Sequence, residues 1–255
     1  MTLISSKQIN NHPYIQAYFT TRHGGISQSP YGTLNLAFHV GDKEEDVLAN
    51  HRRLGEELNY DYHKLIYMRQ IHSDIICVVD STMNFESPPQ CDALITNHFD
   101  VPLMVMSADC TPILIYDPVN HAIAAVHAGR AGALNAILPK TLYAMQSHFG
   151  TSLKDVQIVL GPSIHRCCYE INEVIEKEVK EKDYEDALVH INEKIFLDVN
   201  TILHSQLHAM GISSQCIESV SQCTACNSEK YFSYRADHQH TGRIAGIIML
   251  RSLPV

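Results

Sequence analysis

The chain has 255 residues, of which 45% are hydrophobic and 18% charged, a profile typical of an ordinary globular protein and unlike that of disordered or fibrous chains. Its formal net charge of −9 argues against a protein that binds a phosphate backbone, so we expect no nucleic-acid partner. Apolar runs such as residues 247–250 are far shorter than the roughly 20 residues of a membrane-spanning helix, so we expect no membrane partner either.

The amino-terminal residues contain no apolar stretch of the kind found in secretory signals. We therefore expect a cytoplasmic protein whose eight cysteines are free thiols or metal ligands. No repeat and no linker rich in Pro, Gly or Ser interrupts the chain, which favours one domain over residues 1–255.

The first predicted elements lie between residues 34 and 58. Apolar and polar residues alternate over 34–40, which predicts a half-buried strand. Asp42 followed by Glu45 has the spacing of a capping box and predicts the start of a helix. The apolar residues expected on the inner face of this helix are Val47, Leu54 and Leu58.

Three short apolar runs in the centre of the chain predict buried strands, at 103–106, 113–116 and 122–126. A glycine-containing turn and a helical stretch rich in Ala and Leu follow them, and Pro139 should kink or divide that helix.

The second half of the chain alternates strand and helix patterns. We expect a strand at 156–160, a solvated charged helix within 173–186, a core-packed helix over 199–210 that ends at Gly211, and a last strand at 243–250. The interleaved elements indicate an α/β or α+β class with a mixed sheet.

His72, Cys110 and His127 are the candidates for a metal site, because each lies at the end of an apolar strand. Cys110 and His127 are 17 positions apart with one strand and a turn between them, which could bring two strand ends together. Two imidazoles and one thiolate suit Zn²⁺, and three protein ligands with a fourth position open are typical of a catalytic site. The alternative is a buried thiol beside two core histidines.

Other patterns are less specific. Gly129 and Gly132 before a helix could present backbone N–H groups to an anion, although a tight turn explains them equally well. The motif of Cys223 and Cys226 followed by His238 and His240 does not have the spacing of a compact zinc finger. We expect the adjacent Cys167 and Cys168 to be packing residues, and we expect no metal at Cys226.

A series of segments in fixed order resembles the YfiH/laccase-domain family. The matching segments are FTTRHGGIS (19–27), LNL (34–36), VGD (40–42), QIHS (70–73), ADCTP (108–112), HAG (127–129), GPSI (161–164), YE (169–170), CT (223–224), FSYR (232–235) and TGR (241–243). Members of this family were once described as polyphenol oxidases and are now regarded as purine nucleoside phosphorylases with adenosine deaminase activity. The match covers about residues 19 to 249, nearly the whole chain.

The resemblance implies an α+β fold, a four-layer α/β/β/α sandwich with mixed sheets in one domain. It also implies one catalytic zinc ion per chain at His72, Cys110 and His127, with copper a less fitting metal. Its substrates would be purine nucleosides (adenosine, inosine, guanosine or methylthioadenosine) and phosphate, which yield the base and ribose 1-phosphate.

Candidate roles follow for several other residues. Asp109, beside Cys110, is the candidate for proton transfer, or else an acceptor that orients a ligand. Arg22 and Arg235 are candidate anion contacts, or else surface ion pairs. Asn35 and Gln70 lie in matched segments and are further candidates for substrate binding.

One segment departs from the family pattern. The family usually reads HAGWRG, whereas residues 127–132 read HAGRAG, with Arg130 at the Trp position and Ala131 at the Arg position. If the usual Arg holds an anion, Arg130 must reach the same place for phosphorolysis to survive.

Three other functions compete with this one. A copper polyphenol oxidase would need several His-x-His pairs, and the sequence offers only His238 and His240. A metal-free hydrolase could use Cys110 as nucleophile and His127 as base. A non-catalytic metal-binding module is the third alternative.

Overall fold

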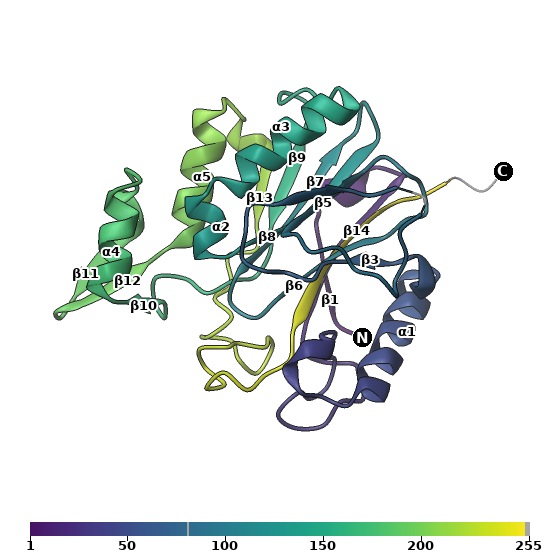
Figure 1. The fold of residues 1–255 in the computed structure, drawn as a ribbon, viewed down its shortest axis with the longest axis horizontal. Coiled ribbons are helices and arrows are strands. Elements are labelled where there is room, and N and C mark those ends of the chain that lie inside the picture. The colour runs from purple at the N-terminus through teal and green to yellow at the C-terminus, as the bar shows by residue number, and fades with distance from the viewer. Residues whose placement is uncertain (81, 253–255) are drawn as a thin grey trace.

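The computed structural model describes residues 1–80 and 82–252, and two large sheets form its body (Figure 1). The five-stranded sheet has the order β1 (Leu3–Ser5), β2 (Ile15–Thr20), β14 (Ile244–Leu250), β6 (Leu103–Ser107) and β3 (Ile66–Tyr67). The six-stranded sheet has the order β13 (Ile217–Ser219), β9 (Gln157–Leu160), β7 (Thr111–Asp117), β8 (Ala122–Ala128), β5 (Ala93–Thr96) and β4 (Ile76–Val78). Both contain parallel and antiparallel pairs, so both are mixed sheets.

The central strands are buried on both faces because the two sheets pack against each other and helices cover their outer faces. In β7, Ile113 and Ile115 face the core under the helices, whereas Leu114 and Tyr116 face the core between the sheets. Strands covered on both sides have continuous apolar sequences, which explains why the three central runs were predicted correctly.

Helices form the two outer layers. α1 (Glu44–Leu58) covers the five-stranded sheet, where Leu54 and Leu58 pack with Met104 and Met106 of β6. α2 (Arg130–Leu134), α3 (Ile137–Phe149) and α5 (Val199–Ala209) cover the six-stranded sheet. The order of the layers is therefore α/β/β/α, and the expected α+β four-layer sandwich is confirmed.

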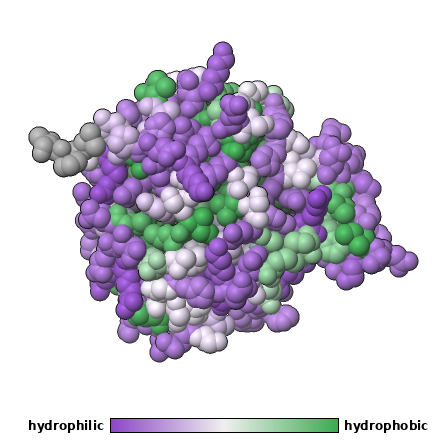
Figure 2. All heavy atoms as spheres, turned by 180° about the vertical axis from the view of Figure 1, so that it is seen from behind, coloured by the Kyte–Doolittle hydropathy of each residue, from purple (hydrophilic) through white to green (hydrophobic). Residues whose placement is uncertain are grey.

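A small lobe projects from the side of the sandwich (Figure 1). It consists of α4 (Glu173–Lys180) and a three-stranded antiparallel sheet in the order β10 (Glu170–Ile171), β12 (Lys194–Leu197) and β11 (Leu188–Ile191). The face of the molecule in Figure 2 is largely hydrophilic, with apolar side chains in separate groups. No helix in residues 1–80 and 82–252 is long and apolar enough to cross a membrane.

The predicted strand at 34–40 is wrong. Residues 34–37 belong to no strand, and Phe38–Val40 form a 3₁₀ turn. The physical reason is the Asn35 side chain, which is fully buried and bonds the backbone N–H and C=O of Ala37. A short polar side chain that bonds its own backbone two residues on competes with strand pairing.

The predicted capping box is also wrong, although the helix it announced is present. α1 begins after Lys43 without a side-chain cap, and Asp42 instead accepts a hydrogen bond from Asn35 Nδ2 at 3.0 Å. Three acidic residues in the first turn, Glu44, Glu45 and Asp46, favour this helix start through the helix dipole.

One helix boundary differs from expectation. The division between α2 and α3 falls at Asn135 and Ala136, not at Pro139, because Pro139 lies in the first turn of α3, where its missing N–H has no partner to lose. The charged helix expected within 173–186 ends at Lys180. Within it Glu176 and Lys180 form an ion pair at 2.8 Å, and Glu178 pairs with Arg130 of α2.

Candidate metal and substrate site

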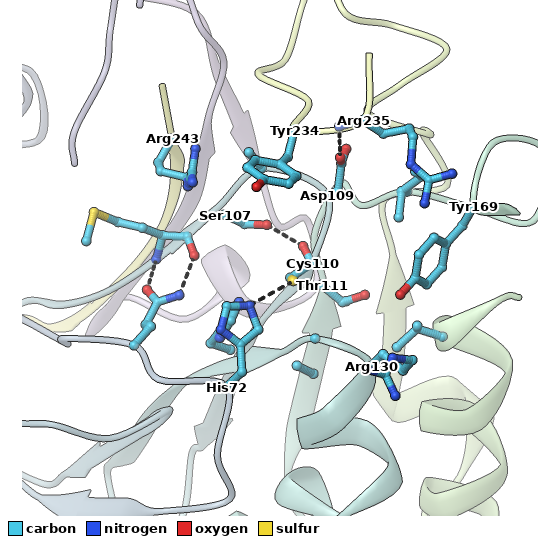
Figure 3. Close-up of a pocket in the computed structure, with 18 of the residues that line it drawn as sticks. His72, Ser107, Asp109, Cys110, Thr111, Arg130, Tyr169, Tyr234, Arg235 and Arg243 are labelled. Atoms are coloured by element: carbon cyan, nitrogen blue, oxygen red, sulfur yellow. Dashed lines mark hydrogen bonds between the residues drawn. The ribbon is translucent and has the colours of Figure 1, made fainter. Parts of the chain in front are cut away.

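A cavity of about 570 Å³ lies at the ends of β6, β7 and β8 (Figure 3). Antiparallel pairing of β7 with β8 sets Thr111 opposite Ala128, so the residues just before β7 and at the end of β8 meet here. Its lining includes His39, Gln70, His72, Ser107, Asp109, Cys110, Thr111, His127, Gly129, Arg130, Ile164, Tyr169, Tyr234, Arg235 and Arg243.

The structure brings His72, Cys110 and His127 together in this cavity. One ligand atom from each lies within 4.8 Å of the others, and Cys110 Sγ is 3.9 Å from His72 Nε2. The His72 and His127 rings are 4.9 Å apart and nearly perpendicular. The three side chains converge from the loop after β3, the turn before β7 and the strand β8.

Asp92 orients two of these residues, although it lies in none of the matched segments. Its fully buried carboxylate lies 2.8 Å from His127 Nδ1 and accepts hydrogen bonds from the backbone N–H of His72 and of Ser73. Because Nδ1 of His127 is engaged, Nε2 is free to face the cavity. Burial works against the charge, but these hydrogen bonds prevail and lower the pKa of Asp92 to about 2. The only signal in the sequence was an acidic residue directly before the apolar strand β5.

The ionisation of Cys110 and His127 is linked. Burial opposes both charges, yet the facing imidazoles lower the pKa of the Cys110 thiol, and Cys110 with Asp92 raises the pKa of His127. A thiolate beside two imidazoles is a donor set that suits zinc.

Gly129 leaves open space beside two of these candidate ligands. A Cβ atom at this position would lie 2.9 Å from Cys110 Sγ and 3.2 Å from His72 Cδ2. Any larger residue would therefore crowd Cys110 and His72. The donor set, the orienting carboxylate and this gap fit a bound zinc ion.

Asp109 lines the same cavity, and its carboxylate is held by protein groups. One oxygen accepts a hydrogen bond from Thr224 Oγ1 at 2.7 Å, and the other accepts one from the backbone N–H of Arg235 at 2.7 Å. These contacts tie the turn before β7 to the loop between β13 and β14. Each oxygen keeps a second lone pair for a ligand.

Arg130 and Arg235 both line the cavity, on either side of the Tyr169 ring (Figure 3). Arg130 forms an ion pair with Glu178 of α4. Arg235 donates to the backbone oxygens of Cys168 and Glu170, and its guanidinium lies 5.4 Å from the centre of the Tyr169 ring. Each guanidinium retains N–H groups that no described side chain uses.

Arg22 and Asn35 do not line the cavity. Arg22 donates to the backbone oxygens of Gly32 and Ser228 and stacks on Phe232. Asn35 accepts a hydrogen bond from the backbone N–H of Arg243 at 3.0 Å, so it acts on the cavity through that residue.

Gln70 lines the cavity, but both ends of its amide bond Met106 of β6, at 2.8 Å each. This pairing fixes the segment that carries His72.

Three further residues line the cavity and lie in matched segments, but their sequence context indicated no role for them: Tyr169, Tyr234 and Arg243. One terminal nitrogen of Arg243 bonds the backbone oxygens of Thr241 and Gly242, which leaves its other nitrogens free. Its position at the start of β14, a strand end beside the cavity, was the available signal.

The pair Cys223 and Cys226 lies outside this cavity. The structure brings it to Cys167 and Cys168, and not to His238 and His240, so the grouping considered from the sequence is wrong.

The sequence and fold match proteins that are already known. Residues 16–251 match the family model described as multi-copper polyphenol oxidoreductase laccase. A purine nucleoside phosphorylase of Corynebacterium glutamicum is 36% identical over 241 residues, which cover 94% of this chain and 96% of that protein. The purine nucleoside phosphorylase YlmD of Geobacillus stearothermophilus is 30% identical over 243 residues, which cover 91% and 89%.

Solved structures share the whole fold. The hypothetical protein YfiH of Bacillus licheniformis superposes with a TM-score of 0.92 at 28% identity, over 98% of this chain and 97% of that one. The structure of YlmD from Geobacillus stearothermophilus superposes with a TM-score of 0.89 at 28% identity, over 94% and 93%.

Proposed function

Because the chain belongs to the multi-copper polyphenol oxidoreductase laccase family, also known as the YfiH family, we propose that it is a zinc-dependent purine nucleoside phosphorylase. Its substrates are purine nucleosides and phosphate, and its products are the free base and ribose 1-phosphate. The observation that carries this proposal is one cavity that combines a His₂Cys ligand set with arginines and aromatic rings. Relatives that carry the same name over nearly their whole length support it.

His72, Cys110 and His127 would hold the zinc ion, and Asp92 would keep His127 in the tautomer that binds it. When bound, zinc supplies Lewis acidity to an oxygen or nitrogen atom of the substrate. Residues of the chain must carry out the remaining steps of the reaction. They must place phosphate beside C1′ of the ribose and stabilise the purine as the C–N bond breaks.

We assign phosphate binding to Arg130 and Arg235. Both line the cavity on the side of Tyr169, and the Arg235 guanidinium is held by the backbone oxygens of Cys168 and Glu170. A guanidinium that is already oriented loses little freedom when it binds a phosphate oxygen. Arg130 stands one position before the Arg of the usual family pattern, and its place in the cavity supports its use as a substitute.

We assign the purine to the opposite wall, where Tyr234 and Arg243 lie (Figure 3). An exposed aromatic ring can stack on a base, and the free Arg243 nitrogens can donate to a purine ring nitrogen or carbonyl oxygen. Such a donor stabilises the negative charge that develops on the departing base.

Adenosine deaminase activity is a second candidate, favoured by the position of Asp109 in the same cavity, next in sequence to Cys110. In this reaction water attacks C6 of adenine and ammonia leaves, which requires a group that transfers protons. Asp109 keeps one lone pair on each oxygen for this purpose.

The donor sets argue against the alternatives. Within residues 1–80 and 82–252, the groups of three or more metal-binding side chains are His72–Cys110–His127 and four cysteines, and neither is a multi-histidine copper cluster. Copper oxidation of polyphenols is therefore the weaker proposal. A Cys110 hydrolase could use His127 as base and Asp92 as the carboxylate that orients it, but it would give no role to His72, the third member of the group.

We further propose that the chain acts as one domain, because residues of both large sheets build a common core. Free cysteines throughout support a cytoplasmic location. The expected partners are small molecules only.

Incubation of adenosine, inosine and guanosine with and without inorganic phosphate, followed by chromatography, tests the function. We expect free base and ribose 1-phosphate only when phosphate is present, and loss of both in Cys110→Ala. The matched control is Cys216→Ser, a cysteine outside both metal-binding groups, which should keep the parent activity. Inosine formed from adenosine without phosphate would show the deaminase. No base from any nucleoside would overturn the phosphorylase proposal.

A further inference from the structure

Four cysteines form a second cluster outside the cavity. Cys167 and Cys168 lie in the turn before β10, and Cys223 and Cys226 lie in the turns after β13. Their four sulfur atoms all lie within 4.8 Å of one another, and Cys226 Sγ is 3.4 Å from Cys167 Sγ and 3.3 Å from Cys168 Sγ. Four of the eight cysteines of the chain thus lie together. They come from two segments that are more than 50 residues apart in sequence.

These distances fit four ligands of a single ion. A zinc ion with sulfur ligands at about 2.3 Å sets the sulfur atoms of a tetrahedron about 3.8 Å apart. A disulfide requires about 2.05 Å, and all four cysteines are free thiols in the structure. Iron–sulfur clusters hold their cysteine sulfurs further apart because several iron atoms lie between them.

The surroundings hold the sulfur atoms in place. Cys223 is buried, and the backbone N–H groups of His165 and Cys226 bond its sulfur. Thr224 donates its backbone N–H to Ser163, which pins the two segments together next to the cluster. Cys167 and Cys226 are exposed, so an ion can enter from solvent.

We propose that Cys167, Cys168, Cys223 and Cys226 bind one zinc ion in a structural site distinct from the cavity. Four thiolates complete the coordination of zinc and leave no position for substrate. Binding releases the thiol protons to solvent, with no change of oxidation state.

The position of this site indicates what it stabilises. One of its segments continues into Tyr169 and the other into Tyr234 and Arg235, so the ion would join the two sides of the cavity wall. Arg235 donates to the backbone oxygen of Cys168, which is the contact that such a link would preserve. We therefore expect loss of this ion to weaken substrate binding, so that KM rises by a larger factor than kcat falls.

Metal analysis of variants tests the proposal. Protein purified under reducing conditions with added zinc should hold one equivalent that depends on Cys226 and Cys168, measured by elemental analysis after removal of loosely bound metal. Cys226→Ser and Cys168→Ser should each lose one equivalent, whereas the matched control Cys216→Ser should lose none. Cys110→Ala should retain this equivalent, and Cys110→Ala combined with Cys226→Ser should hold none.

This design separates the two sites. If the cavity binds no zinc, the parent protein holds one equivalent, and Cys226→Ser abolishes it. If the four-cysteine site is absent, Cys226→Ser changes nothing, and this result overturns the inference whatever the cavity holds.

A measurement on the parent protein tests the site even if the cysteine variants fail to fold. Titration with an organomercurial in the presence of a colorimetric zinc chelator should release one equivalent from these four thiols, in addition to any equivalent that Cys110 holds. Peptide mapping after alkylation should find all four cysteines as thiols. Disulfides among them in zinc-loaded, reduced protein, or four reactive thiols with no zinc release, would contradict the site.

Discussion

At the residue scale, the side chain on which the metal site depends most is Asp92, although it touches no substrate. Its buried carboxylate accepts hydrogen bonds from three consecutive backbone N–H groups, those of Ile71, His72 and Ser73, and it lies 2.8 Å from His127 Nδ1. The three ligands could be predicted because each lies at a strand end and within a segment that matches the family. Asp92 lies in no such segment, and its sequence separation of 35 residues from His127 gives no pattern that would reveal the contact.

Asp92→Asn should lower zinc affinity about 10- to 100-fold, because an amide no longer fixes the His127 tautomer. A competition titration with a chelator measures this. The matched control is Asp117→Asn at the other end of β7, which is equally buried and bonds Asn120 and Val119. It should cost stability but leave zinc affinity within about twofold. Equal effects of both substitutions on zinc would contradict the role of Asp92.

The charge pairing of Cys110 with the histidines predicts a pH dependence in the metal-free protein. A lowered thiol pKa means that the reactive thiolate persists as pH falls below the ordinary cysteine range of about 8 to 9. Alkylation of Cys110 by iodoacetamide should therefore have its midpoint below that range, and zinc should suppress it. Cys91 serves as the control, because burial raises its pKa to about 12 and should keep it unreactive. A Cys110 midpoint in the ordinary range would refute the pairing.

Arg130 allows a test of the departure at residues 127–132. Loss of a charge-assisted hydrogen bond to phosphate costs about 1.5–3 kcal/mol, so Arg130→Ala should lower kcat/KM for phosphorolysis about 10- to 150-fold and spare zinc binding. Glu178→Gln is the matched control, since it removes the same ion pair but keeps the guanidinium. If both substitutions lower activity equally, Arg130 only tethers α4. In that case Arg235 becomes the next candidate for the anion.

At the scale of elements, the apolar sequence pattern predicted the central strands correctly but did not predict the conformation of the loops. The runs at 103–106, 113–116 and 122–126 became β6, β7 and β8 because both faces of each strand are covered. The alternation at 34–40 misled, because its polar member Asn35 is buried and bonds backbone groups on both sides. The alternation of apolar and polar residues indicates which positions are buried. It does not indicate which backbone groups of a loop a polar side chain will hydrogen-bond.

Asn35→Ala tests whether this residue supports the loop or binds substrate. The substitution leaves the backbone N–H groups of Ala37 and Arg243 without their acceptor, at about 1–3 kcal/mol for each group that stays buried. We expect the free energy of unfolding to fall by about 2–4 kcal/mol in denaturant titration. A rise in KM without loss of stability would instead favour direct contact with the nucleoside.

At the scale of the whole molecule, the resemblance carried by short motifs predicted the four layers, whereas the distance between the two sheets depends on contacts that no motif describes. Phe19 of β2 lies opposite Gly246 of β14 in register and also packs over Gly161, which directly follows β9 of the other sheet. The Phe19 ring therefore occupies the space between the sheets that Gly161 and Gly246 leave free, because glycine has no side chain.

Gly161→Ala should separate the sheets, because its Cβ would overlap the Phe19 ring. Overpacking of this kind costs about 1–3 kcal/mol, measured as a loss of unfolding free energy in denaturant. The smaller ring-free side chain in Phe19→Leu should relieve the overlap, so the double variant should be more stable than the sum of the two single losses predicts. Additive losses would show that Gly161 is required for the backbone path into residues 162–164 and not for the spacing of the sheets. Zinc content should stay unchanged in all three variants, because neither substitution replaces one of the proposed ligands.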